Sequence, residues 1–202
     1  MLGSSIACAL LLVTVYIALY QNLVTQARQQ LVDFHYGLNM KVAASRVDSY
    51  IDQQRQQLAA LAAQKSTIEN FSAADKGSLD SGESSAAATI TDAEAIYYVD
   101  SNIIRHSGKL GFAAKHMLRL SQQGKVVDPR AVKVDNQWKI LFSQAVVADN
   151  KIIGNILAQM PTSGLRFALG TIDNSPGLLQ LQQISAHNRA VKIVEIGTGA
   201  EG

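Results

Sequence analysis

Residues suited to metal binding or nucleophilic chemistry are few in this sequence and lie far apart. There is one cysteine, Cys8, and there are four histidines, His35, His106, His116 and His187. Their spacing matches no paired metal-ligand set, and the sequence has no phosphate-binding loop, G-x-S-x-G, H-E-x-x-H or dinucleotide glycine motif. One cysteine also excludes an intrachain disulfide. We therefore predict no catalytic residue, no metal site and no cofactor.

The composition is that of a folded chain with many apolar residues. Of the 202 residues, 48% are hydrophobic and 17% are charged, which excludes a wholly disordered polymer. The formal net charge is +2, from 18 basic and 16 acidic residues, and the basic residues are scattered. This charge is too small to indicate a nucleic-acid surface, so no nucleic-acid partner is expected.

The most apolar segment lies at the beginning of the chain. No charged residue precedes Arg28, and residues 6–20 are apolar at every position except one. As a helix, residues 2–20 would extend about 28 Å, close to the thickness of a hydrocarbon core. A cleaved signal peptide is the competing interpretation, but no basic stretch precedes the run and no small-residue cleavage site follows Tyr20. We expect residues 1–20 to be a transmembrane anchor that contacts the lipid bilayer through residues 2–20.

Residues 21–71 predict one long amphipathic helix that continues from the anchor. The segment has no proline, one glycine and many Gln, Ala and Leu, which are good helix formers. Its apolar residues recur mostly at steps of three and four, which indicates one stripe: Leu23, Ala27, Leu31, Phe34, Leu38, Val42, Val47, Tyr50, Leu58, Leu61 and Ile68. The stripe could pack on the chain's own domain or on a second copy as a homodimer, and the sequence does not separate the two.

The rest of the chain predicts an α+β domain with an antiparallel sheet packed on the long helix. Residues 72–88 are rich in Ser, Ala and Gly, and we predict a flexible loop there. Strands are expected over residues 95–100, 103–107, 131–134, 137–147 and 152–160, with a helix over 112–120 after the second strand. The turns are Asp135-Asn136 and Asp149-Asn150. The domain then covers residues 89–170 and ends with a short helix over 162–169, followed by a C-terminal hairpin in 171–197 and a tail or linker over 198–202.

This order of elements resembles the extracytoplasmic PAS-like Cache family of sensor domains, which sit directly after a transmembrane helix. Residues 95–107, as the first two strands, carry the resemblance together with residues 138–160 (WKILFSQAVVADNKIIGNILAQM). In the second segment Ile153-Gly154 matches the small residue after the turn of the family's last hairpin. The resemblance implies a sensor or ligand-binding module, by itself or as the regulatory N-terminal part of a longer protein.

The resemblance also implies a location. It places the chain in the inner (cytoplasmic) membrane as a single-pass protein, with its globular domain in the periplasm. Charge alone leaves the orientation open. Arg28, Lys41 and Arg46 follow the span and weakly favour a cytoplasmic side for the rest of the chain, but the N-terminal flank carries no charge for comparison.

In Cache-like folds small molecules lie between the sheet and the segment that joins its early strands to the later ones. The resemblance therefore implies Tyr98 and Trp138 as pocket walls, and Asp100, Arg105 and His106 as polar contacts. Strand alternation puts Tyr98 and Asp100 on one face, and a guanidinium such as Arg105 suits a small anionic ligand. The same residues also fit structural roles, as core side chains or as a surface ion pair. The Arg-x-Trp-Tyr signature of amino-acid-binding members is absent.

Two other interpretations remain open. Residues 110–120 (LGFAAKHMLRL), with the later strands and the hairpin at 178–195, look like the membrane-attached N-terminal region of long bacterial phosphomannomutase/phosphoglucomutase. The phosphoserine and magnesium loops of that enzyme are absent, and residues 185–188 (SAHN) are better explained as a turn. A bitopic structural scaffold subunit of a bacterial envelope assembly is the alternative function, because such subunits also combine one span, a helix and a small α+β domain.

Overall fold

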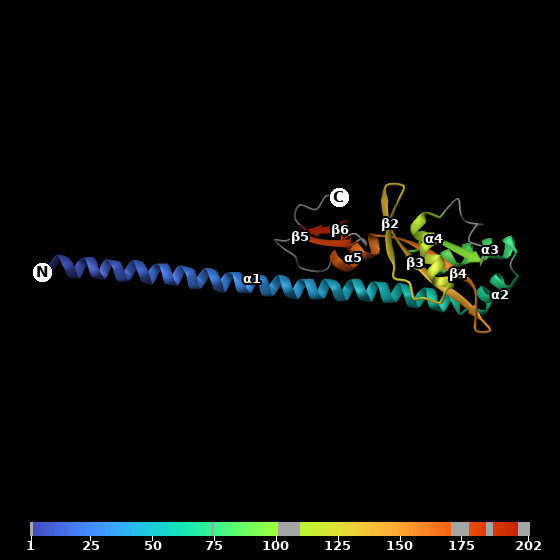
Figure 1. Cartoon of the computed structure of the whole chain (residues 1–202), viewed down its shortest axis with the longest axis horizontal. Helices are drawn as coiled ribbons and strands as arrows, with labels where there is room; N and C mark the ends of the chain where they lie inside the picture. The colour runs from blue at the N-terminus through green and yellow to red at the C-terminus, as the bar shows by residue number, and fades with distance from the viewer. Residues whose placement is uncertain (1, 74, 101–109, 171–177, 185–187, 198–202) are drawn as a thin grey trace. The chain divides into compact units, whose positions relative to one another are not determined.

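The computed structural model describes residues 2–73, 75–100, 110–170, 178–184 and 188–197, with side chains from Tyr20 onward. The elements are α1 (Leu2–Ala62), α2 (Lys65–Ala73), α3 (Lys76–Thr89), β1 (Ala95–Asp100), α4 (Phe112–Gln122), β2 (Arg130–Val134), β3 (Gln137–Ala148), β4 (Lys151–Pro161), α5 (Ser163–Gly170), β5 (Leu178–Ile184) and β6 (Ala190–Gly197) (Figure 1). The chain divides into two compact units, residues 1–44 and 45–202, and α1 contributes to both. The predicted α+β class with a long helix and an antiparallel sheet is confirmed.

Helix α1 has different surroundings in the two units. In residues 20–44 the apolar stripe predicted from the sequence is solvent-exposed, with Leu23, Leu31, Phe34 and Leu38 each at least half exposed. In residues 45–62 one face is buried through Tyr50, Gln54, Leu58 and Leu61, at steps of four, four and three. Among the side chains that the structure describes, no helix is long and apolar enough to cross a membrane. The predicted anchor at residues 1–20 lies outside those side chains, except for Tyr20.

The prediction of one unbroken helix over residues 21–71 is wrong. Helix α1 ends at Ala62 and α2 begins at Lys65. At the break the helix ends in a 3₁₀-type turn, in which the Gln64 amide donates to the Leu61 carbonyl, three residues back, at 3.1 Å. No proline or glycine marks this site in the sequence. The break gives α2 its own direction, so that Thr67 and Phe71 are buried in the domain core.

The prediction of a flexible loop over residues 72–88 is also wrong, since α3 occupies most of that segment. Asp75 caps the helix by accepting a hydrogen bond from the Ser78 amide at 2.9 Å. Leu79, Gly82 and Ala86 form its buried face. Small residues let α3 approach β1 closely, because a methyl group on Gly82 would lie 2.6 Å from the Tyr98 ring. Close packing of small side chains therefore replaces the large apolar residues that this helix lacks.

Four strands form the main sheet in the order β1-β4-β3-β2, and every neighbouring pair is antiparallel. The turns predicted between its last three strands are confirmed. Asp135 and Asn136 have φ values of 48° and 64°, and Asp149 and Asn150 have 50° and 58°. Two consecutive left-handed residues are typical of the tight turn that matches strand twist. The predicted strand over residues 103–107 lies outside the described residues.

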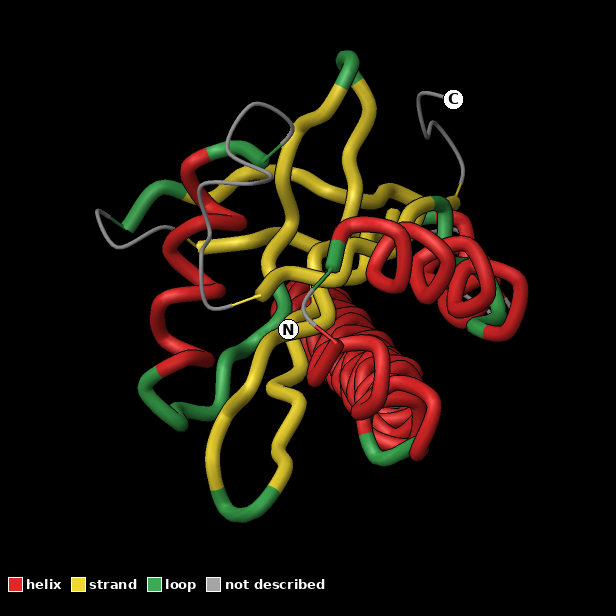
Figure 2. The backbone as a smooth tube through the Cα atoms, turned by 90° about the vertical axis from the view of Figure 1, so that its right-hand side faces the viewer, coloured by secondary structure: helices red, strands yellow, loops and turns green. Residues whose placement is uncertain are grey.

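Each face of the main sheet packs against a different set of helices (Figure 2). Helix α4 covers the face that carries Val99, Leu141 and Leu157, and these side chains form a cluster with buried residues of and just before α4: Leu110, Ala114, Met117 and Leu118. Helices α2 and α3 cover the opposite face. A methyl group on Gly154 would lie 2.3 Å from the Phe71 ring, so a glycine allows α2 to touch β4.

The C-terminal hairpin is confirmed as a separate two-stranded sheet of β5 and β6. Helix α5 packs on β6, and Leu165 and Leu169 of α5 and Ile193 and Val194 of β6 are all buried. The rest of the predicted hairpin segment at residues 171–177, and the predicted tail at 198–202, lie outside the described residues.

Candidate ligand pocket

A pocket of about 580 Å³ lies between the main sheet and α4. This volume is within the usual range of small-molecule sites, about 300–1,000 Å³. Its lining mixes apolar and polar side chains from all four strands and the start of α4: Tyr97, Leu110, Gly111, Phe112, Ala113, Ala114, Val132, Lys133, Val134, Asp135, Leu141, Leu157 and Gln159.

The register of the sheet brings the floor of this pocket together. Tyr97 is paired with Leu157, and Leu141 is paired with Gln159, so alternation puts all four on the face that α4 covers. Helix α4 begins after Gly111 and presents Phe112 beside the pocket. The Phe112 side chain is 84% exposed and its ring lies over that of His116 at 6.5 Å. An exposed aromatic ring at the rim supplies apolar area that a ligand could cover.

Four polar residues belong to the lining: Tyr97, Lys133, Asp135 and Gln159. Tyr97 and Gln159 lie on the face that α4 covers, whereas Lys133 and Asp135 lie at the edge, in and after β2. Burial raises the pKa of Tyr97 above its ordinary value of 10.0, and the nearby carboxylates of Glu83 and Glu94 raise it further. The phenol therefore stays neutral at physiological pH and can donate a hydrogen bond.

A buried lysine lies on the same sheet as the pocket but is already paired. Lys139 Nζ donates to Glu94 Oε1 at 2.8 Å and to Gln137 Oε1 at 2.9 Å. Its side chain is only 8% exposed. Burial is costly for a charge unless it is paired in this way, so Lys139 serves the fold. Lys133 is the lysine among the lining residues. It is exposed at the end of the edge strand β2 and is paired with Trp138, so its side chain starts on the face away from α4 and must extend round the sheet edge to meet a ligand.

Tyr98, predicted as a pocket wall, is a core residue on the other face of the sheet. It is 1% exposed, and its ring stacks on Phe71 with centroids 5.0 Å apart. Its hydroxyl lies 3.3 Å from Thr67 Oγ1. The Tyr98 amide donates to Glu83 Oε1 at 2.8 Å, which ties β1 to α3. Tyr98 therefore holds α2 and α3 on the sheet.

The other predicted site residues do not gather in this pocket either. Trp138 is half-buried, and alternation along β3 puts it on the face of Ile140 and Phe142, away from α4. Asp100 shares the Tyr98 face and is not part of the pocket lining. Arg105 and His106 lie outside the described residues. A pocket does lie between the sheet and the segment that joins β1 to the later strands, but Tyr98 and Trp138, the residues predicted as its walls, belong to the opposite face.

Sequence reasoning missed Tyr97, Lys133, Asp135 and Gln159 as lining residues. The signal that could have found Tyr97 was alternation along Tyr97-Tyr98, which puts two adjacent tyrosines on opposite faces. The pattern does not say which face a ligand meets, because both faces of β1 are largely buried. Lys133 and Asp135 could have been found from their position at the end of β2, next to the turn.

The described residues offer no metal-binding cluster of three or more His, Cys, Asp or Glu side chains.

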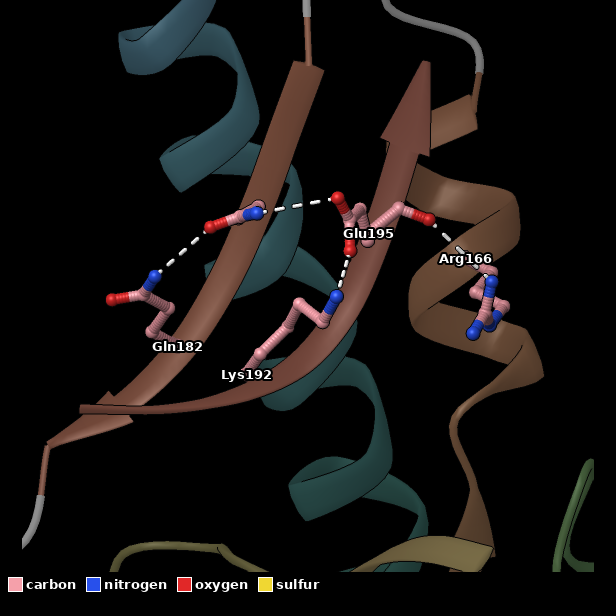
Figure 3. Close-up of polar contacts among 5 residues, drawn as sticks. Arg166, Gln182, Lys192 and Glu195 are labelled. Atoms are coloured by element: carbon pink, nitrogen blue, oxygen red, sulfur yellow. Dashed lines mark hydrogen bonds and ion pairs between the residues drawn. The ribbon is translucent and has the colours of Figure 1, made fainter. Parts of the chain in front are cut away.

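A cluster of polar side chains outside the pocket is centred on Glu195 of β6 and is shown in Figure 3. The Glu195 carboxylate accepts a hydrogen bond from Gln180 Nε2 at 3.2 Å and pairs with Lys192, and its backbone oxygen accepts from Arg166 of α5 at 3.5 Å. The hydrogen bond from Lys192 is the main cause that lowers the pKa of Glu195, followed by that from Gln180. These groups satisfy one another, so the cluster is a structural link between α5 and the hairpin.

Comparison with known proteins identifies the fold as that of a sensory domain. The sensory domain of the Campylobacter jejuni chemoreceptor Tlp3 with isoleucine bound aligns with a TM-score of 0.54 and 15% sequence identity, over 75% of this chain and 66% of that domain. The ligand-binding domain of the same receptor in complex with L-valine aligns with a TM-score of 0.53 and 16% sequence identity, over 75% of this chain and 66% of that domain. The same domain in complex with L-norvaline aligns with a TM-score of 0.52 and 14% sequence identity, over 75% of this chain and 65% of that domain. The chain thus spans slightly less than two thirds of these domains.

These likenesses support the sensor-domain resemblance at the level of the fold. No family model and no curated protein matches the sequence. These neighbours lend no support to the resemblance to phosphomannomutase.

Proposed function

We propose that this chain is a membrane-anchored extracytoplasmic sensor module that binds a small molecule in the pocket between α4 and the main sheet. The observation that carries the proposal is the pocket itself, which lies between the sheet and the segment that joins β1 to the later strands. Its apolar walls and its few polar groups have the composition of a small-molecule site. The fold shared with a receptor's sensory domain supports the same function.

The lining favours a small organic ligand with one anionic end. Leu110, Val132 and Leu157 supply apolar contact, and the neutral Tyr97 hydroxyl supplies a donor. The long side chain of Lys133 supplies a positive charge from the edge of the sheet. The structural neighbours were solved with isoleucine, L-valine and L-norvaline, but this sequence lacks the Arg-x-Trp-Tyr signature. A binding panel should therefore include both amino acids and simple carboxylic acids.

Calorimetric titration of the full chain with that panel tests the ligand proposal. We expect at least one carboxylic acid to bind, and Lys133→Ala to weaken it about tenfold or more, since charged hydrogen bonds contribute about 1.5–3 kcal/mol. Lys151→Ala is the matched control, because Lys151 is also exposed but lies at the β3–β4 turn, outside the pocket lining. Equal affinity in the two variants, or no binding across the panel, would refute the proposal.

Signalling requires that the ligand prefer one of two states of the domain. We infer that α1 transmits this preference, because it is continuous from Leu2 to Ala62 and its residues 45–62 share the core of the sensory domain.

The apolar residues 2–20 would anchor the helix in the inner membrane, with the domain in the periplasm. Labelling of a Ser84→Cys variant in a Cys8→Ser background tests on which side of the membrane the domain lies, because Ser84 is exposed on α3. A membrane-impermeant thiol reagent should label intact cells, and labelling only after lysis would contradict a periplasmic domain.

A homodimer through the N-terminal part of α1 is the partner that we propose. Leu23, Leu31, Phe34 and Leu38 are 69%, 69%, 72% and 50% exposed and lie on one side of the helix. A second copy presents the same stripe, which suits a two-fold symmetric interface. Leu31→Cys in the Cys8→Ser background should form a disulfide-linked dimer under mild oxidation. Asp33→Cys, on another side of the helix, should crosslink far less, and equal crosslinking would count against the interface.

The scaffold alternative receives less support. A sheet with two βαββ repeats would favour it, but the described main sheet has one helix between β1 and β2 and then three consecutive antiparallel strands. No specific observation on the described residues favours that alternative.

A further inference from the structure

A second groove, lined by residues other than those of the α4 pocket, contains buried polar atoms without a partner among the described residues. The groove has a volume of about 680 Å³ and lies between α1, α5 and the turn before β1. Its lining includes Arg46, Tyr50 and Gln54 of α1, Asp92 of the turn, and Gly164 and Phe167 of α5. All of these residues belong to the unit of residues 45–202.

Two lining side chains carry buried polar atoms without a partner. Tyr50 is 8% exposed and Gln54 is 2% exposed, and among the described residues neither Tyr50 Oη nor Gln54 Oε1 has a hydrogen-bond partner. Buried polar atoms in proteins are usually hydrogen-bonded. Tyr50 and Gln54 are four residues apart, so they lie on the same face of α1 one turn apart. Both oxygens are covered in this structure, so a ligand in the groove reaches them only when neighbouring lining side chains shift, and it then supplies the missing partner for each.

The polar and charged groups around the groove indicate which charged groups a ligand should carry. The amide oxygen of Gln54 can only accept a hydrogen bond, and the Asp92 carboxylate adds a negative charge close enough to influence Tyr50. Both suit an ammonium group. At the other end Arg46 donates one N–H to the Ala168 carbonyl at 3.2 Å, and a guanidinium has five N–H donors in all. Its charge suits a carboxylate.

The Tyr50 hydroxyl is available as a donor at any physiological pH. Burial raises its pKa to about 12, with a smaller contribution from Asp92. The ring is held against α5, since a methyl group on Gly164 would lie 2.6 Å from Tyr50 Cε2 and 2.7 Å from Oη. A molecule that pairs with this hydroxyl therefore contacts α1 and α5 together.

We propose that this groove is a second binding site, distinct from the α4 pocket, for a small zwitterion that carries one primary ammonium and one carboxylate. The ammonium pairs with Gln54 Oε1 and Asp92, and the carboxylate pairs with Arg46 and the Tyr50 hydroxyl. Occupation of the site links the helix that leads to the N-terminus with the C-terminal helix α5 and its hairpin.

Calorimetric titration of the full chain with the free amino acids tests this site. For the amino acid that binds best, its N-acetyl and carboxamide derivatives should bind about tenfold more weakly or worse, because each lacks one charge. Gln54→Leu and Tyr50→Phe should each weaken binding of the free amino acid by about tenfold. Both variants should melt at a temperature at least as high as the parent chain, because each removes an unpartnered buried polar atom.

The matched control is Gln57→Leu. Gln57 Oε1 is also buried with no hydrogen-bond partner in the described part of the chain, but Gln57 lies outside the groove lining, so this variant should bind like the parent. Lys133→Ala, in the α4 pocket, should also leave this binding unchanged. Equal binding by the Gln54 and Gln57 variants, loss of binding in Lys133→Ala alone, or no amino-acid binding at all would overturn the proposal. Loss in Lys133→Ala alone would still support the α4 pocket, so the two proposals can fail separately.

Discussion

The side chain of Gln183 pairs with the backbone of Ala131 as a neighbouring strand would. The Ala131 amide donates to Gln183 Oε1 at 2.8 Å, and Gln183 Nε2 donates to the Ala131 carbonyl at 3.3 Å. Ala131 belongs to β2, an edge strand of the main sheet, and Gln183 belongs to β5 of the hairpin. One side chain therefore satisfies both backbone groups of an edge position and joins the two sheets.

Gln183→Ala should loosen this junction without unfolding the domain. Two hydrogen bonds at about 0.5–1.5 kcal/mol each predict a loss of about 1–3 kcal/mol of unfolding free energy. Amide exchange of residues 178–184 and 190–197 should quicken. Gln182→Ala is the matched control, because the exposed Gln182 side chain donates to Gln180 Oε1 at 3.0 Å, within the same strand. If denaturation gave both variants the same small loss, the junction would have no energetic role.

Gly154→Ala should destabilise the domain strongly. The new methyl group would lie 2.3 Å from two atoms of the Phe71 ring and 3.1 Å from the Val99 carbonyl oxygen, so α2 must shift. Overpacking of a core costs about 1–3 kcal/mol. Phe71→Leu in the same chain should recover part of the loss, because the ring is the main obstacle. The measurement is a double-mutant cycle by chemical denaturation, and additive losses would show that the contact with Phe71 is not the cause.

The Glu195 cluster predicts a loss of stability in acid. Because Lys192 and Gln180 lower the pKa of Glu195 in the folded chain below its ordinary value of 4.5, the unfolded chain binds the proton first as the pH falls. The stabilisation is therefore complete above about pH 4.5 and decreases as the pH falls through the folded pKa. Glu195→Gln should remove this component and flatten the melting temperature below pH 4.5. Glu69→Gln, in an exposed pair with Lys65, is the control. An unchanged acid slope in the Glu195 variant would contradict this cause.

The elements that could be predicted from the sequence are those whose signals are local. The two Asp-Asn turns need left-handed residues, and they fixed the boundaries of β2, β3 and β4. Helix α4 ends before Gly124, which has φ of +71° as a glycine stop requires. Neither signal depends on distant residues.

The elements that could not be predicted depend on tertiary contacts. Helix α3 has too few large apolar residues to predict burial, and it is stable because Gly82 fits against Tyr98. The break after Ala62 has no local signal and follows from the packing of Phe71 on Gly154. For the site, alternation separates Tyr97 from Tyr98, but only the position of α4 shows which of them faces a pocket.

Hydrogen exchange of the full chain, with and without the carboxylic acid of the panel that binds best, tests most directly whether the ligand sits between α4 and the sheet. The account predicts slower exchange in residues 110–114 and 132–135, which line the pocket, with little change at residues 67–71 and 79–86 around Tyr98. Protection confined to the Tyr98 side, with none at the start of α4 or in β2, would contradict it.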